Sequence, residues 1–332
     1  MKTGKQKLIF ILSILLLLLC ALASVSYGSK TVSIRSVIGS FFPIGADSFE
    51  VSVVRARIPR TVFGLIAGAA LGVSGALMQS ITRNPIADPS ILGVNTGASL
   101  FVVTGIAFFQ INTGSHYMLL AFAGAGITAL FVYGLASTGR GGATPVKLAL
   151  AGSAANTALQ SLVNTVMLPK TQVMDQFRFW QTGSIGGATW DDIILLLPYF
   201  FAGFLISLAM ASSLNALALG EETAVSLGIR VGLVRALSAT AGVLLCASVT
   251  ALAGPIGFVG LMVPHLVRML FGPDMRKILP MSAIGGSCLL LLSDVLGRVL
   301  GSPGELETGI VTALLGAPVF IFIVRKAKVR TL

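Results

Sequence analysis

The sequence predicts an all-α polytopic membrane protein that crosses a bilayer about ten times. Of its 332 residues, 55% are hydrophobic and 11% are charged, whereas soluble domains carry about 25% charged residues. Long apolar runs separate the basic residues, and a bilayer core needs roughly 20 helical residues to cross it. This composition excludes a soluble globular protein, and the formal net charge of +11 must be explained by where the charges lie.

Ten apolar runs, bounded by charges, Pro-Asp pairs or glycine clusters, predict the membrane-spanning helices. They cover approximately residues 8–27, 58–81, 91–110, 117–137, 146–168, 193–212, 231–253, 256–271, 279–297 and 307–324. The eighth run is short and follows Gly254-Pro255. An even number of spans places both termini on one side of the membrane, within a single domain of residues 1–332.

The first run has an alternative interpretation as a signal peptide, because Lys2, Lys5 and Lys7 precede an apolar stretch ending near Ala23. We favour a retained span, since the run continues to Tyr27 and is long enough to cross the bilayer.

The basic residues follow the positive-inside rule when the N-terminus is cytoplasmic. Fifteen Lys and Arg then lie inside with four acidic residues, while eight lie outside with eight acidic residues. The whole excess of +11 therefore lies on the cytoplasmic side, and it gives no reason to expect a nucleic acid partner.

The loops are too short for an enzyme domain, so we expect no catalytic residue and no metal site. No G-x-x-x-x-G-K-[ST] motif is present, so any ATPase that drives transport is another chain. A secondary transporter usually has ionisable residues at mid-membrane. The first seven spans contain none in their interiors, and in the later spans His265, Arg268 and Asp294 lie towards the span ends. An ATP-independent channel or facilitator remains the alternative from a different class.

The fifth span has a polar face. Its polar residues recur every three or four positions and therefore share one side of a helix; they are Ser153, Asn156, Thr157, Gln160, Ser161, Asn164 and Thr165. Because lipid does not solvate such a face, it meets either other helices or a water-filled path. Thr308, Thr312 and Gly316 repeat the pattern more weakly in the last span. We favour a neutral translocation wall, with interhelical hydrogen bonding as the alternative.

Three arginines, Arg55, Arg57 and Arg60, stand together at the outer mouth of the second span. Because Lys and Arg are normally concentrated on the cytoplasmic side, a cluster of arginines on the translocated side requires an explanation. An acidic partner that docks from outside is one explanation, and contact with lipid headgroups is the other.

The loop of about residues 213–230 predicts a short cytoplasmic helix. Glu221 and Glu222 favour a helix N-terminus, and Gly228 is placed to end the helix. A helix of under two turns is marginal unless something packs on it. It is either a docking surface for an ATPase or a helix that lies in the lipid interface.

Several motifs resemble the permease subunits of iron-siderophore, haem and cobalamin ABC importers. They are Gly68-Ala-Ala-Leu-Gly-Val-Ser-Gly-Ala-Leu-Met-Gln79, Asn84-Pro-Ile-Ala-Asp-Pro89, Leu92-Gly-Val94, Ala218-Leu-Gly-Glu-Glu222, Leu227-Gly228, Gly254-Pro-Ile-Gly-Phe-Val-Gly-Leu261, Val263-Pro-His265 with Arg268, and Gly316-Ala-Pro-Val-Phe320. The resemblance runs from about residue 50 to the C-terminus.

The resemblance implies a type II ABC importer permease fold in a bacterial cytoplasmic membrane, with both termini cytoplasmic. A second permease subunit, identical or related, would complete the path for an iron(III)-siderophore complex, with haem or cobalamin as alternative cargo. Two cytoplasmic ABC ATPase subunits would hold ATP and Mg, and an extracytoplasmic siderophore-binding protein would deliver the substrate. No cofactor is expected in this chain.

The resemblance also implies roles for individual residues. Arginines matching Arg57, Arg60 and Arg298 pair with glutamates of the binding protein in this family. The loop containing Glu221, Glu222, Leu227 and Gly228 matches the coupling helix that sits in an ATPase cleft. The family pathway is lined largely by the fifth and tenth helices, and its cytoplasmic exit narrows at the turn corresponding to residues 142–145.

Overall fold

The structure is a computed structural model that describes the chain except residues 1, 29–30, 34–48, 112, 140–141 and 327–332. The described residues form twelve α-helices and one 3-10 helix, and they include no strand. The helices are α1 (Lys2–Ser26), α3 (Phe49–Ile81), η1 (Pro89–Leu92), α4 (Val94–Phe109), α5 (Gly114–Ser137), α6 (Pro145–Met167), α7 (Thr171–Gln181), α8 (Trp190–Leu217), α9 (Glu221–Ser226), α10 (Val231–Ala253), α11 (Val259–Phe271), α12 (Met275–Leu300) and α13 (Thr308–Lys326). The prediction of an all-α membrane protein is confirmed.

Each of the ten predicted spans corresponds to one of these helices. Six described helices, α1, α3, α5, α8, α10 and α12, are long and apolar enough to cross a membrane by length and composition. Helices α4, α11 and α13 are also apolar but are shorter. Helix α6 has 23 residues and contains the polar face.

The structure differs from the prediction most clearly at two span boundaries and in one additional helix. The second span begins at Phe49 instead of residue 58, so that Pro59 lies inside α3. The sixth span continues to Leu217, and the loop expected at about 213–230 is shortened accordingly. A further helix, α7, was not predicted as an element, because its amphipathic sequence is too polar to resemble a span.

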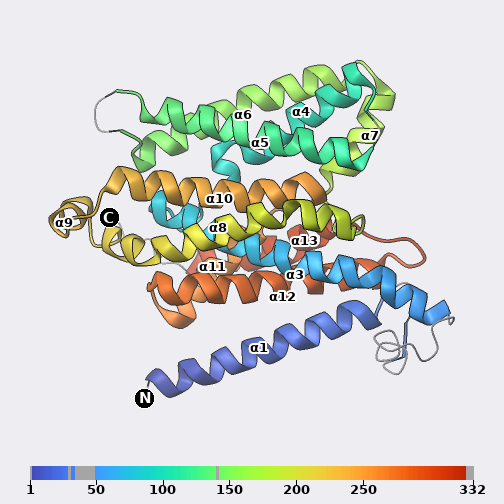
Figure 1. Cartoon of the computed structure of the whole chain (residues 1–332), viewed down its shortest axis with the longest axis horizontal. Coiled ribbons are helices and arrows are strands. Elements are labelled where there is room, and N and C mark those ends of the chain that lie inside the picture. The colour runs from blue at the N-terminus through green and yellow to red at the C-terminus, as the bar shows by residue number, and fades with distance from the viewer. Residues whose placement is uncertain (1, 29–30, 34–48, 112, 140–141, 327–332) are drawn as a thin grey trace.

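Helix α3 lies inside the bundle and packs against α12, α10, α11, α8 and α1 (Figure 1). On one side of α10 lie α4, α5 and α6, while α1 leans along the opposite edge against α12 and α3. The N- and C-terminal ends lie at the same end of the bundle as α9 (Figure 1). We call this the α9 end and the other the far end.

Glycines of α3 allow its close packing. A Cβ atom at Gly72 would stand 2.1 Å from the carbonyl oxygen of Ser282 on α12, and one at Gly75 would stand 1.8 Å from that of Gly260 on α11. Only glycine permits backbones to approach so closely. Gly68 and Gly72, which are four residues apart, both lie against the backbone of α12, so this spacing of glycines serves helix packing.

Candidate transport, docking and coupling sites

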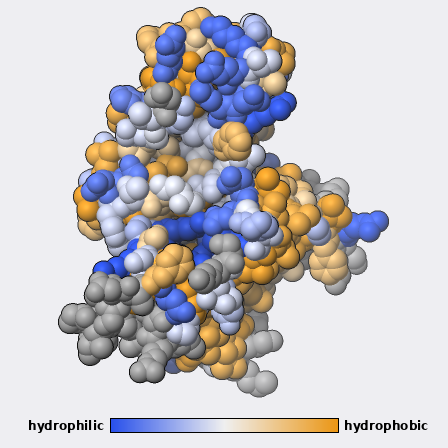
Figure 2. All heavy atoms as spheres, turned by 90° about the vertical axis from the view of Figure 1, so that its right-hand side faces the viewer, coloured by the Kyte–Doolittle hydropathy of each residue, from blue (hydrophilic) through white to orange (hydrophobic). Residues whose placement is uncertain are grey.

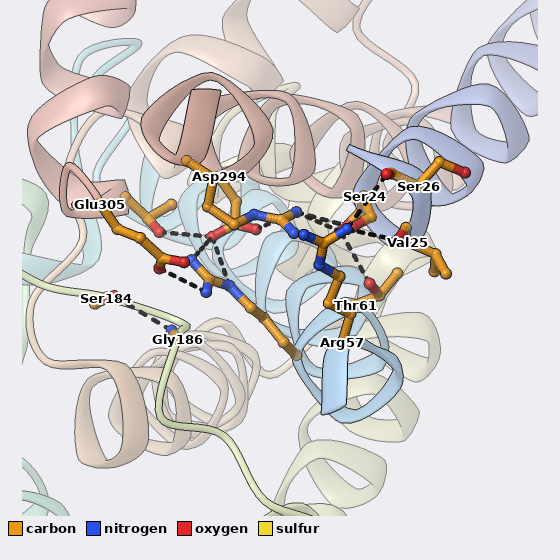
Figure 3. A network of polar contacts seen from close by, with 12 residues as sticks. Ser24, Val25, Ser26, Arg57, Thr61, Ser184, Gly186, Asp294 and Glu305 are labelled. Carbon is orange, nitrogen blue, oxygen red and sulfur yellow. Dashed lines mark hydrogen bonds and ion pairs between the residues drawn. The ribbon is translucent and has the colours of Figure 1, made fainter. Parts of the chain in front are cut away.

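At the far end, three arginines and two acids form a polar network that we call the far-end cluster (Figure 3). Arg60 contacts Asp294 and Glu305, with a nitrogen-to-oxygen distance of 2.7 Å in each pair. Arg298 pairs with the same Asp294 at 2.9 Å. Arg57 completes the cluster, whose three guanidinium groups and two carboxylates have a net formal charge of +1.

The cluster also holds the end of α1. The Arg57 guanidinium donates to the carbonyl oxygens of Val25 and Ser26, at 3.1 and 3.3 Å, and Arg298 donates to that of Ser24 at 2.9 Å. Carbonyl groups in the last turn of a helix lack intrahelical partners and attract cations. These arginines therefore join α1 to α3 and α12.

The structure brings Arg57, Arg60 and Arg298 together, as their proposed common role requires, but it turns them inward. Arg298 is 1% exposed and Arg57 9%, while the Arg60 side chain is 12% exposed and its partner Glu305 44%. The Arg60–Glu305 pair is therefore the accessible edge of the cluster. Hydrophilic residues gather across this end of the molecule (Figure 2).

Sequence reasoning did not identify Asp294 and Glu305 as members of this site. The available signal was charge balance, because Asp294 is an acid near the end of an apolar span and lies one helical turn before Arg298.

At the α9 end, the predicted short helix is present and projects beyond the spans (Figure 1). Glu221 and Glu222 occupy its first turn. Gly228 follows it with φ of 79°, a left-handed conformation that favours glycine. Three apolar side chains in and beside α9 are more than half exposed: Leu219 (69%), Val225 (61%) and Leu227 (62%). This apolar tip lacks a covering partner among the described residues.

One arginine connects α9 to a distant part of the chain. Arg235, in the second turn of α10, is 4% exposed and contacts the Glu221 carboxylate at 2.5 Å. Its other terminal nitrogen donates to the carbonyl oxygen of Ala143 at 3.3 Å. A single buried guanidinium therefore links α9, α10 and the turn that precedes α6. Sequence reasoning missed this link.

The turn that contains Ala143 is fastened to the start of α6. Thr144 caps the helix by accepting from the Lys147 backbone N–H at 3.4 Å, and Pro145 occupies the first helical position. The Lys147 ammonium group donates to the carbonyl oxygens of Thr138 and Gly142. Arg235 therefore contacts the head of α6 as well as α9.

Most of the polar face on α6 is exposed in this chain; its exposed members are Ser153, Thr157, Gln160, Ser161, Asn164 and Thr165. Several of their hydrogen bonds stay within α6, such as that of Gln160 to Asn164. Asn156 differs, because its side chain donates to the Ser90 carbonyl oxygen and accepts from the Thr96 hydroxyl. Interhelical hydrogen bonding thus accounts for Asn156 and leaves the rest of the face unexplained.

The weaker pattern in the last span lies in the interior. Thr308 and Thr312 are both fully buried; the Thr308 hydroxyl donates to Asp294, and that of Thr312 donates to the carbonyl oxygen of Gly309. A Cβ atom at Gly316 would stand 2.5 Å from the Phe258 side chain. The expected polar surface on α13 is therefore absent at these positions, because close packing against neighbouring segments covers them.

Comparison with known proteins identifies the chain. The sequence pattern of the FecCD transport family matches residues 16–326. The chain belongs to the FecCD transport family. A FecCD relative, the ferric enterobactin transport system permease protein of Escherichia coli (strain K12), is 42% identical over 94% of this chain and 93% of its own length. The Fe(3+)-citrate import system permease protein of Bacillus subtilis (strain 168) is 38% identical over 98% and 97%.

A solved structure also resembles this FecCD chain. It is described as a metal-chelate type ABC transporter in an inward-facing conformation, and it superposes with a TM-score of 0.83 at 28% identity. The similarity covers 97% of this chain and 99% of the other. The resemblance to importer permeases noted in the sequence is thereby confirmed for the fold and the family.

Proposed function

We propose that this FecCD chain is the permease subunit of an ABC importer that moves an iron(III)-siderophore complex across a bacterial cytoplasmic membrane. The observation that carries the proposal is the polar face of α6, which the other described helices leave exposed. A chain that spans a lipid bilayer needs a second surface against this face. A second permease subunit, identical or related, supplies that surface, and the path runs between the two.

The proposed path is polar and neutral along α6. Ser153, Thr157, Gln160 and Asn164 contribute hydroxyl and amide groups to it, and Asn156 holds the helix against η1 and α4. Such groups hydrate a bulky chelate without binding it tightly. Thr308 and Thr312 are buried and help to fix α13, so they do not line this wall.

The proposed energy source lies on two cytoplasmic ATPase subunits, which hold ATP and Mg. The apolar tip of α9 docks in a cleft of one ATPase subunit, with Leu227 and the acids Glu221 and Glu222 at the contact. Burial of exposed apolar side chains is the main favourable term in such an association. The positive-inside distribution supports a cytoplasmic location for this end and for both termini.

The proposed route from α9 to the path is Arg235. When an ATPase displaces α9, the ion pair with Glu221 moves the guanidinium, and its bond to Ala143 carries the displacement to the head of α6. The buried position of Arg235 favours this role, because a pair with one buried partner is screened less by salt than a fully exposed pair.

At the far end, an extracytoplasmic siderophore-binding protein docks on the far-end cluster. Acidic groups of that partner compete with Glu305 for Arg60, because Glu305 is the half-exposed member of that ion pair. Arg57 and Arg298 keep the cluster positive and fix its position.

The test is uptake by proteoliposomes that contain this chain with its second permease subunit, its ATPase subunits and its binding protein. The probes are iron-55 chelates of enterobactin, citrate and a hydroxamate siderophore, with radiolabelled cobalamin as a comparison. The proposal predicts iron uptake that requires ATP, the ATPase and the binding protein. Equal flux through the chain alone would instead indicate a channel or facilitator.

A further inference from the structure

A groove at the α9 end lies outside the sites described above. It has a volume of about 500 Å³ and lies between the start of α1, the end of α11 and the start of α12. Its lining residues are Gln6, Lys7, Phe10, Ile11, Phe271, Arg276, Lys277, Pro280 and Met281. The groove is therefore distant in sequence from α6 and α9 and needs its own explanation.

The lining divides into a cationic part and an apolar part. Lys7, Arg276 and Lys277 provide three positive charges, and none of the nine lining residues is acidic. Phe10 and Ile11 line the apolar part and are 42% and 62% exposed. A groove with this division fits a ligand that has an anionic head and a hydrocarbon tail.

Two of the three cations, Lys277 and Arg276, have neutral hydrogen-bond partners in the structure. The Lys277 ammonium group donates to the Gln6 side-chain oxygen at 3.0 Å, and the Arg276 guanidinium donates to the Ser212 hydroxyl at 3.1 and 3.3 Å. Neither hydroxyl nor amide neutralises a positive charge. Each cation can therefore gain electrostatic energy from an anion that enters the groove.

The acid beside these cations is Asp274, which precedes α12. Its carboxylate accepts from Asn215 at 2.7 Å and from the backbone N–H of Arg276 at 3.0 Å. These hydrogen bonds, the one from Asn215 foremost, hold the pKa of Asp274 below its ordinary value. Asp274 is thus charged at neutral pH, and one negative charge faces three positive ones, which leaves an excess of +2.

The groove lies at the ends of the membrane-spanning helices, which is the level where lipid headgroups lie. Lys7 lies before the exposed leucines of the first span, and Arg276 and Lys277 lie in the first turn of α12. Basic residues at the ends of spans extend to the interface where lipid phosphates lie, and pockets of this kind between helices recognise anionic headgroups.

We propose that this groove binds one anionic phospholipid. Its phosphate contacts Lys7, Arg276 and Lys277, and an acyl chain follows Phe10 and Ile11 along the side of α1. The bound lipid then joins α1 to α12 at the α9 end, as the arginines join these helices at the far end. The inference does not depend on the cargo or partners proposed above.

Native mass spectrometry of the full-length chain tests this proposal. The protein is extracted from vesicles that contain equal amounts of phosphatidylglycerol and phosphatidylethanolamine, and the retained lipid is counted. We expect wild-type protein to retain phosphatidylglycerol selectively. The double variant Arg276→Gln/Lys277→Gln should lose it by about 25-fold in affinity, since each basic residue near an anionic surface contributes roughly fivefold.

The matched control is Arg230→Gln/Arg325→Gln. It removes two exposed positive charges from residues that do not line the groove. Equal loss of phosphatidylglycerol in both double variants, or equal retention of both lipids by wild type, would overturn the proposal. Both pairs are exposed in the structure, and circular dichroism verifies that the variants are folded.

A second comparison distinguishes a lipid from a free phosphate ion. Phe10→Ala/Ile11→Ala should weaken retention of phosphatidylglycerol, because the acyl chain loses its contact, and millimolar inorganic phosphate should fail to displace the lipid from wild type. Displacement by inorganic phosphate, with unchanged retention in the apolar variant, would show a site for soluble anions and refute the lipid proposal.

Discussion

Both ends of the bundle contain buried arginines, but the arginines at the two ends connect different kinds of structural element. At the far end, Arg57 and Arg298 bind the last turn of α1, and Asp294 is shared between two arginines. At the α9 end, Arg235 joins a six-residue helix to a turn. The first arrangement fixes long helices against each other, whereas the second connects two short segments.

This difference indicates which parts of the molecule can be displaced by a partner. Long packed helices and a shared carboxylate resist displacement, since breaking one contact leaves other charges buried without a partner. A six-residue helix has little stability of its own and follows whatever packs on it. We therefore expect changes at the far end to alter stability most and changes at the α9 end to alter coupling most.

The largest expected effect is the loss of protein stability caused by a substitution in the far-end cluster. Asp294→Asn removes the charge shared by Arg60 and Arg298, and because Arg298 is 1% exposed, it leaves a buried cation without its counterion. Such losses reduce the free energy of unfolding by about 3–5 kcal/mol. Thermal unfolding in detergent micelles measures the change.

The control for this prediction is Glu305→Gln, which removes the half-exposed acid of the same cluster. An exposed pair contributes about 0–1 kcal/mol. If the two variants lowered stability equally, the contrast between the buried and accessible parts of the cluster would be wrong.

A smaller effect separates Asn156 from the rest of the polar face. Asn156→Ala removes hydrogen bonds to Ser90 and Thr96, and it should lower the free energy of unfolding by about 1–3 kcal/mol. Gln160→Ala, on the exposed part of the face, should leave stability unchanged. Urea denaturation of both variants measures the two losses of stability. A larger loss in Gln160→Ala than in Asn156→Ala would show that Asn156 does not anchor α6.

Coupling should be sensitive at the end of α9. Gly228→Val forces a β-branched residue into a left-handed conformation, which costs about 1–3 kcal/mol of local strain. We expect ATP hydrolysis to continue while uptake falls. Gly232→Val is the control, because that position is equally open but has no positive φ. Normal uptake by Gly228→Val would show that the turn geometry is unimportant for coupling.

The smallest effect predicted for a single substitution is that of Glu305→Gln on docking. Glu305→Gln removes the acid that competes for Arg60 and should tighten binding of the siderophore-binding protein by a few-fold, about 1 kcal/mol at most. Reversing both Arg57 and Arg60 to Glu should abolish binding. Isothermal titration of the siderophore-binding protein into permease in nanodiscs measures the affinity of each variant. Unchanged affinity in both variants would place the docking site elsewhere.

Sequence alone could predict the spans and α9 because their signals are local. Apolar runs record burial in lipid, and the acids at 221 and 222 with Gly228 mark a short helix. The far-end cluster was predicted in part, since its arginines stand near span ends. The inward orientation of Arg57 depends on carbonyl groups of α1 about thirty residues away, and that of Arg298 on a carbonyl group 274 positions away.

Other features depend on packing and could not be predicted. The Arg235 contact joins residues separated by 92 positions, so no local pattern records it. Thr308 and Thr312 show the opposite failure, because a polar spacing that suggested a surface is covered once α12 packs beside α13. The same spacing on α6 stays exposed, and only the arrangement of neighbouring helices distinguishes the two.

The most direct test of the account is the effect of Arg235→Gln on the ratio of uptake to ATP hydrolysis in the reconstituted importer. We also expect Glu221→Gln, at the half-exposed end of the same ion pair, to act in the same direction with less risk to folding. Arg230→Gln, which removes an exposed charge from the loop between α9 and α10, is the matched control. The account predicts near-normal ATP hydrolysis, a large loss of uptake in the first two variants and normal coupling in the third. Uptake and hydrolysis that change in proportion, or not at all, in Arg235→Gln and Glu221→Gln would contradict it.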